Sequence, residues 1–388
     1  MIERTAAKTL SRLASQFPVV GITGPRQSGK STLAKMVFPH KKYISFDDKN
    51  MRELAMSAPS DFLDAFPDGA VIDEAQKVPD IFDAVKYNVD NTTYKPGKFI
   101  LTGSNQFRLR ENMTDSLAGR AAFLRLLPLS IAEINSANLL KKSPYEHIFT
   151  GEYPSLYDQR KHFLVFDWLE GYIDTYLDLD IQNHITPANL SAFKKFLKYC
   201  ATYSGQILSM ENIAANVGVS SPTIKTWLSL LENSFIIYLL RPSTNNLGKT
   251  LTKSPKLYFL DSGLLCHLLQ INSPEDLILS PYRGAVVETF AVAELLKKRL
   301  NDGQTPNIFY YRDKKGFEID IIAEWQKTHA IEIKSTTTSE KKLSANVRKY
   351  LTLRADNCQG IVYYLGDLSC TINDINYIGW QHWSELEQ

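Results

Sequence analysis

The sequence FPVVGITGPRQSGKSTLAKMVF, residues 17–38, decides the class of fold. It contains the pattern of a phosphate-binding loop, in which a glycine is followed by any four residues and then by Gly-Lys-Ser. These are Gly24, Gly29, Lys30 and Ser31. The apolar run 19–23 predicts a strand before the loop, and residues 31–37 predict a helix after it. In this order backbone N–H groups can close around phosphate at the positive end of the helix dipole. The alternative is a glycine turn that happens to precede a helix.

The side chains of this loop suit a nucleotide with its metal ion. Lys30 would neutralise the β- and γ-phosphates, and Ser31 would offer its hydroxyl to Mg²⁺. ATP and Mg²⁺ are therefore the expected cofactors. The residues predicted to bind the nucleotide are Gly24, Pro25, Arg26, Gln27, Ser28, Gly29, Lys30, Ser31 and Thr32.

Two later apolar stretches end in polar residues that fit the same chemistry. GAVIDEAQ, residues 69–76, ends its strand at Asp73, which suits Mg²⁺, and at Glu74, which could polarise an attacking water. KFILTGSN, residues 98–105, ends in Ser104 and Asn105, where a side chain could orient that water. A Glu directly after the Asp, and an additional strand between the loop and the acid pair, favour hydrolysis over kinase-type transfer.

Five predicted strands alternate with helical stretches in the first third of the chain. YISFDD, residues 43–48, and AAFLRLLPL, residues 121–129, complete the set. This alternation predicts an α/β fold with a parallel sheet.

Composition describes an ordinary globular chain of two or three domains. It has 388 residues, 44% of them hydrophobic and 22% charged, with a net charge of +2. A nucleic-acid partner would need a local basic patch. The spacing of the four cysteines suggests neither zinc nor a disulfide framework, and there is no signal-peptide core or apolar run of about 18 residues. We expect a cytoplasmic protein without a membrane partner.

The middle of the chain predicts a helix-turn-helix followed by two strands. In residues 208–240, Ile213, Ala214 and Val217 mark the first helix and Gly218 the turn. The second helix begins at Ser221-Pro222, and its predicted buried face is Ile224, Trp227, Leu228 and Leu231. FIIYLL and KLYFLD would form a wing. The second helix exposes one basic residue, Lys225, so packing between domains or subunits is an alternative to DNA contact.

A charged hairpin stands in the last part of the chain. FEIDIIAEWQKTHAIEIKST, residues 317–336, alternates so that Glu318 and Asp320 share one strand face and Glu332 and Lys334 share another. One interpretation is a solvated charged face. The other is a metal site, with Asp320 and Glu332 as oxygen ligands, Lys334 acting on the attacking water, and Glu288 of the predicted helix 283–300 adding a carboxylate. Six basic residues nearby could contact a nucleic-acid backbone: Lys297, Lys298, Arg299, Arg312, Lys314 and Lys315.

The motifs GPRQSGKST, VIDEAQ, ILTGSN and SLAGR resemble those of AAA+-type ATP-binding proteins whose C-terminal half is a domain of uncharacterised function. The likeness runs through almost the whole chain. It implies an acid pair at Asp73 and Glu74, a sensor at Asn105, and an arginine at Arg120 near a γ-phosphate, often one held by a neighbouring subunit. A helix-surface arginine is the alternative for Arg120. The order of helix, strand, strand with Asp and strand with ExK is similar to the PD-(D/E)XK nuclease core.

These expectations combine into an α/β chain with a P-loop NTPase parallel sheet, a helical and winged-helix region, and a restriction-endonuclease-like α/β domain. The expected boundaries are 1–135, 136–188, 189–272 and 273–388. The expected function is that of an oligomeric ATPase coupled to a nuclease-like module that contacts DNA or RNA. The alternative is an ATP-dependent switch or protein remodeller whose nuclease-like fold is an inert scaffold.

Overall fold

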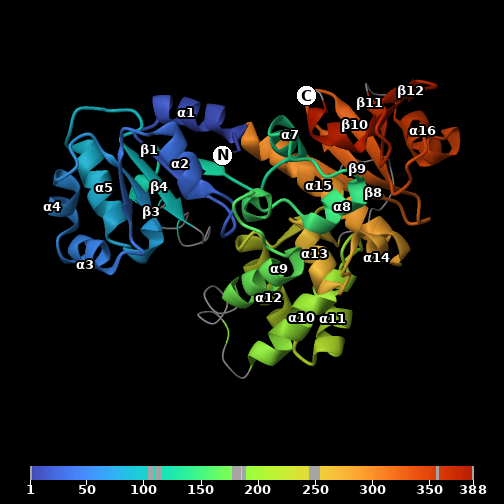
Figure 1. Cartoon of the computed structure of the whole chain (residues 1–388), viewed down its shortest axis with the longest axis horizontal. Helices are drawn as coiled ribbons and strands as arrows, with labels where there is room; N and C mark the ends of the chain where they lie inside the picture. The colour runs from blue at the N-terminus through green and yellow to red at the C-terminus, as the bar shows by residue number, and fades with distance from the viewer. Residues whose placement is uncertain are drawn as a thin grey trace. The chain divides into compact units, whose positions relative to one another are not determined.

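The computed structural model describes residues 2–103, 109, 113, 116–176, 185, 189–243, 254–354 and 358–386. The chain divides into two compact units, coloured along the sequence in Figure 1. The first comprises residues 1–129 with 233–235 and 299–304, and the second comprises 130–232, 236–298 and 305–388. The expected connector, winged-helix and nuclease-like regions all lie mainly in the second unit, and their boundaries at 188 and 272 stay predictions.

The first unit is built on a five-stranded sheet in the order β2-β3-β4-β1-β5, with every neighbouring pair parallel. This confirms the predicted parallel sheet. Strands buried on both faces read as continuous apolar runs, which is why the pattern was recognisable. The strands are β1 Val19–Thr23, β2 Lys42–Ser45, β3 Ala70–Asp73, β4 Phe99–Gly103 and β5 Ala121–Arg125.

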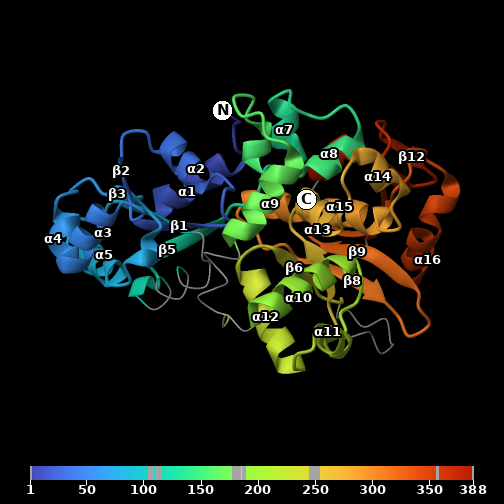
Figure 2. The ribbon, with the colours of Figure 1, turned by 60° about the horizontal axis from the view of Figure 1, so that its bottom comes forward.

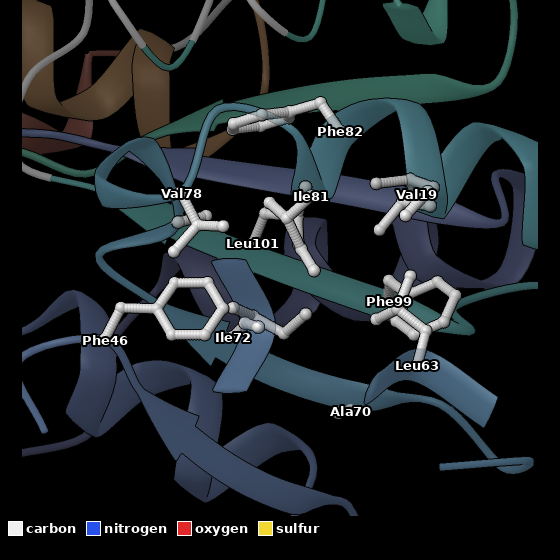
Figure 3. Close-up of a cluster of buried hydrophobic side chains, with 14 of the residues drawn as sticks. Val19, Phe46, Leu63, Ala70, Ile72, Val78, Ile81, Phe82, Phe99 and Leu101 are labelled. Carbon is white, nitrogen blue, oxygen red and sulfur yellow. The ribbon is translucent and has the colours of Figure 1, made fainter. Parts of the chain in front are cut away.

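Helices cover both faces of this sheet. Because side chains alternate along a strand, Val19 of β1 packs into one apolar cluster, with Phe46, Phe82 and Phe99 (Figure 3). Val20 and Ile22 pack into the other cluster, which includes Leu10 and Leu33. The helices are α1 Ala6–Gln16, α2 Lys30–Val37, α3 Lys49–Ser57, α4 Pro59–Asp64 and α5 Ile81–Asp90.

The second unit begins with helices and a two-stranded sheet. The predicted helix, turn, helix and strands are present as α11 Met210–Val217, α12 Ser221–Asn233, β6 Ile237–Leu240 and β7 Lys256–Phe259, with β6 and β7 antiparallel. The four predicted core residues of α12 are buried. Figure 2 shows α10, α11 and α12 lying together. The other helices before β8 are α7 Ile131–Ser136, α8 Pro144–Thr150, α9 Val165–Tyr176, α10 Leu190–Thr202, α13 Ser262–Leu268, α14 Pro274–Leu279 and α15 Arg283–Asn301.

A six-stranded mixed sheet completes the second unit, in the order β12-β13-β11-β10-β9-β8. The predicted hairpin is β9 paired antiparallel with β10, and the helix α16 connects β10 to the parallel strand β11. The elements are β8 Ile308–Arg312, β9 Glu318–Glu324, β10 Thr328–Lys334, α16 Ala345–Leu353, β11 Cys358–Tyr364, β12 Cys370–Ile372 and β13 Ile375–Gly379.

Candidate nucleotide site and a second acidic cluster

The loop between β1 and α2 depends on its two motif glycines for different reasons. A Cβ on Gly24 would lie 2.0 Å from the carbonyl oxygen of Leu126, so only glycine allows this close approach. Gly29 has a φ of 94°, a left-handed conformation that glycine adopts without strain. Pro25, Arg26, Gln27 and Ser28 lie in the same loop, and Thr32 is in the first turn of α2.

Lys30 is the first residue of α2, and its side chain folds back into the loop. It is buried, and its Nζ donates to the carbonyl oxygens of Gly24 at 3.0 Å and Pro25 at 2.7 Å. An ammonium held by uncharged carbonyls inside a loop of backbone donors is well placed to exchange those partners for phosphate oxygens.

Asp73 ends β3, where side chains from three other segments donate to it. Ser31 Oγ lies 3.0 Å and 2.9 Å from its two carboxylate oxygens, and Tyr43 and Thr102 donate to it as well. Burial and the bond to Asp73 raise the pKa of Tyr43, so its hydroxyl remains a donor. A carboxylate and a hydroxyl at one edge of the sheet are hard oxygen donors, which fits Mg²⁺.

Tyr43 and Thr102 were not recognised in the sequence. Both lie in the predicted strands YISFDD and KFILTGSN, so their strand positions were readable. Their bonds to Asp73 depend on the strand order of the sheet, which brings β2 and β4 to either side of β3.

Glu74 directly follows Asp73 and has a left-handed backbone, with φ 54° and ψ 41°. A non-glycine residue with positive φ is uncommon and often marks a functional position. The carboxylate of Glu74 accepts a hydrogen bond from Gln76 Nε2. Asn105, the expected sensor, lies outside the described residues.

Arg120 lies at the far end of the sheet from the loop. The loop follows Thr23, which pairs with Arg125, whereas Arg120 precedes Ala121, which pairs with Val19. Four residue steps separate the two ends, roughly 13 Å of strand. Arg120 forms two bonds to Asp90 of α5, one of them 2.9 Å from Nη2 to Oδ2. It is therefore not beside the loop of its own chain.

The second unit contains an acidic cluster formed by residues from three elements. Glu288 lies on α15, Asp320 on β9, and Glu332 and Lys334 on β10. Asp320 Oδ2 accepts from the main-chain nitrogen of Ile333 at 2.8 Å, and Lys334 donates to Glu332. Glu332 is only 2% exposed, so the interpretation of a solvated charged face is wrong for this residue. Burial, and then the charge of Asp320, raises the pKa of Glu332 to about 7.

Lys256 of β7 enters this cluster and was not predicted to do so. Its Nζ lies 3.1 Å from Glu288 and 2.5 Å from Glu318, and Tyr258 also donates to Glu288. Arg312 donates to the other oxygen of Glu318 at 3.0 Å. A hairpin from the middle of the chain thus supplies the counter-charge to carboxylates of the C-terminal sheet.

The donor set fits a divalent ion only in part. Among the residues that the structure describes, no three His, Cys, Asp or Glu side chains are grouped so as to hold a metal. Asp320 and Glu332 remain as a pair of hard carboxylates, and Mg²⁺ is commonly bound through one or two carboxylates with water. Glu288 is already held by Lys256 and Tyr258.

The predicted basic surface is corrected at two residues. Lys297 is fully buried, with its Nζ 3.3 Å from Glu152 and 2.8 Å from Glu294, and Arg299 is 8% exposed. Neither can contact a nucleic-acid backbone as placed. Lys314 and Lys315 are exposed, as is Lys225 on α12.

The nucleotide loop, the acid at the end of β3 and the sheet order define a P-loop ATPase of the AAA type. A family model described as an AAA domain matches residues 16–135, and models for domains of unknown function, DUF8612 and DUF4143, match residues 141–275 and 283–383. This confirms the resemblance to AAA-type proteins with an uncharacterised C-terminal half.

The family follows from two curated relatives. The uncharacterised proteins Rv2008c of Mycobacterium tuberculosis and Mb2031c of Mycobacterium bovis are each 30% identical over 339 residues, covering 86% of this chain and 74% of the relative. The chain belongs to the family of these proteins. Among solved structures, the Walker-type ATPase PABY2304 of Pyrococcus abyssi has a TM-score of 0.47 and 15% identity over 68% of this chain and 94% of that one. Within the described residues there is no helix long and apolar enough to span a membrane.

Proposed function

We propose that the chain binds ATP and hydrolyses it with Mg²⁺. The observation that carries this proposal is the meeting of Lys30, Ser31 and Asp73 at one edge of the sheet. Lys30 would exchange its carbonyl partners for phosphate oxygens, while Ser31 and Asp73 would hold the ion directly and through its water. Mg²⁺, when bound, supplies charge neutralisation between the phosphates.

Glu74 is the proposed general base, because it follows Asp73 directly and carries a carboxylate that can accept a proton from water. Asn105 is the proposed residue that orients this water. ATP turnover by the full-length chain, compared with Lys30→Ala, tests the proposal. Lys8→Ala is the matched control, because Lys8 is exposed on α1. Unchanged ATP binding in Lys30→Ala would contradict the assignment of the loop.

Self-association is the second part of the proposal. Arg120 sits at the end of the sheet opposite its own loop, so it would serve a γ-phosphate bound by a neighbouring copy. ATPase activity per chain should then rise with protein concentration.

We further propose that nucleotide state is coupled to a nuclease-like module that contacts DNA or RNA. Asp320 and Glu332 on adjacent strands, with Lys334 beside Glu332, favour metal-dependent attack on a phosphodiester. The α11–α12 pair, as a winged-helix-like element, would add a nucleic-acid contact through Lys225. Four scattered cysteines are compatible with work in a reducing cytoplasm.

The competing proposal is an ATP-dependent switch in which this fold is an inert scaffold. The ion pairs of Lys256 with Glu288 and Glu318 favour it, because they neutralise carboxylates without a metal. Cleavage of labelled DNA and RNA by the full chain, with Mg²⁺ or Mn²⁺ and with or without ATP, separates the two. Cleavage that is lost in Asp320→Ala supports the nuclease. The scaffold proposal is supported if no substrate is cut and Mn²⁺ leaves the melting temperature of the chain unchanged.

A further inference from the structure

Arg4 precedes α1 and lies buried against the phosphate loop. Its guanidinium donates to three main-chain carbonyls: Nη1 to Ser28 at 2.7 Å, and Nη2 to Leu127 at 2.7 Å and Pro128 at 3.2 Å. The side chain is 5% exposed. One charged group therefore connects the loop to the segment that follows β5. Arg4 is 24 residues from Ser28 and 123 residues from Leu127 in the sequence.

Ser28 is held chiefly through its main chain. It is completely buried, its nitrogen lies 3.4 Å from the carbonyl oxygen of Pro25, and its hydroxyl finds no hydrogen-bond partner in the described part of the chain. The Ser28 main chain thus makes two hydrogen bonds, one from its nitrogen to Pro25 and one from Arg4 to its carbonyl oxygen. The bond from Arg4, at 2.7 Å, is the shorter. A hydrogen bond from a charged donor is also the stronger kind.

This bond fixes the direction of a neighbouring donor. The peptide between Ser28 and Gly29 is planar, and in a trans peptide the C=O and N–H point in opposite directions. Holding the Ser28 carbonyl towards Arg4 therefore turns the Gly29 N–H away from Arg4. Gly29 is the second glycine of the loop motif and the N-cap of α2. N–H groups at a helix N-terminus are suited to donate to anions.

We propose that Arg4 is a positioning residue of the phosphate loop, which sets the Gly29 N–H for a bound phosphate. This inference rests on the proposed ATP site. An arginine is suited to the position because its rigid fork reaches two segments at once, whereas a lysine presents a single head.

The test compares Arg4→Ala and Arg4→Lys with the wild-type chain. The measurements are the Kd of a fluorescent ATP analogue, kcat and KM for ATP, and the melting temperature without nucleotide. At a temperature where each variant is folded, Arg4→Ala should raise the Kd by about tenfold or more, since a charged hydrogen bond is lost from the binding loop. Arg4→Lys should lie between. Guanidinium ion at millimolar concentration should partly restore binding to Arg4→Ala, which a merely destabilised fold would not show.

Arg12→Ala is the matched control, because Arg12 is exposed on α1, close to Arg4 in sequence, and should bind ATP like the wild type. Wild-type Kd and kcat in folded Arg4→Ala would overturn the inference. If Arg4→Ala does not fold, Arg4→Lys decides, and wild-type values for it would overturn the inference equally. A wild-type chain that fails to bind ATP would instead overturn the nucleotide site itself.

Discussion

Lys256 on β7 and Glu288 on α15 form an ion pair in the second unit, with 3.1 Å between Nζ and Oε1. The side chain of Lys256 is only 3% exposed, and the same Nζ contacts Glu318 on β9. Burial and then the charge of Asp320 raise the pKa of Glu288 to about 7. Lys256 therefore connects β7 to the helix α15 and, through Glu318, to the six-stranded sheet. These contacts are made by a buried ammonium group.

Replacing Lys256 should expose how much this cluster depends on one cation. Lys256→Met should lower the free energy of unfolding by about 3 kcal/mol or more, because removing one partner leaves a buried carboxylate unpaired. The double variant Lys256→Met with Glu288→Gln should lose less than the single one. Urea unfolding of the full chain measures both, with Lys314→Met as the exposed-lysine control. Glu288→Gln alone completes the cycle, and a loss in the double variant equal to the sum of the two single losses would show that the pair carries no coupling.

The same variant tests whether a metal can take the place of the ammonium. With Lys256 gone, Mn²⁺ should raise the melting temperature of the chain more than it does in the wild type, since a divalent ion binding the folded state stabilises it. An equal Mn²⁺ effect in both would indicate that metal and lysine do not compete for these carboxylates.

Glu74→Gln should separate ATP binding from turnover. The amide keeps the shape of the side chain but cannot take a proton from water, so kcat should fall roughly 100-fold or more while ATP binding is retained. Steady-state kinetics and nucleotide binding measure the two properties. Glu53→Gln, an exposed position on α3, is the control. A normal rate in Glu74→Gln would show that the base is another group.

The parts of the fold that rest on local spacing were predictable. The loop, its flanking strand and helix, and the five parallel strands follow from runs of apolar residues and two glycines. The α12 core face and the β9–β10 hairpin follow from periodicities of 3.6 and 2.

Contacts that depend on tertiary arrangement were not predictable. Arg4 reaches Leu127 across 123 residues, and Lys256 reaches Glu288 from another element. Lys297 was misjudged because the run Lys297-Lys298-Arg299 suggests a surface. In fact α15 is buried around much of its circumference, and Glu294 and Lys297, three residues apart, neutralise each other inside.

The buried acid Glu152 predicts a pH dependence of stability. Burial raises its pKa from an ordinary value of 4.5 to about 8, and Lys297 offsets only part of this. Asp261, Glu294 and Ser262 are its other polar neighbours. Between pH 4.5 and 8 the folded chain therefore holds a proton that the unfolded chain has released. The contribution of Glu152 to stability is full below pH 4.5 and is lost as the pH rises through 8.

Glu152→Gln should flatten this part of the profile. From pH 5 to pH 8 the wild type should lose stability relative to Glu152→Gln. The loss should be at most roughly 1.4 kcal/mol for each unit by which folding raises the pKa of Glu152. Urea unfolding at several pH values measures it, and Glu275→Gln on the exposed side of α14 is the control. Parallel profiles for wild type and Glu152→Gln would mean that this carboxylate stays charged throughout.

Arg120 and Glu74 allow a direct test of whether neighbouring copies share a site. If Arg120 acts on the nucleotide of another copy, Arg120→Ala and Glu74→Gln should each be nearly inactive alone. Mixing them should restore activity, because some sites then combine Glu74 from one chain with Arg120 from the other. The recovered rate should rise with total protein concentration. Asp90→Asn, which removes the carboxylate that accepts two bonds from Arg120, should leave activity in place. Full activity in Arg120→Ala would make Arg120 a surface residue paired with Asp90, whereas inactive Arg120→Ala with no recovery on mixing would place its role within its own chain.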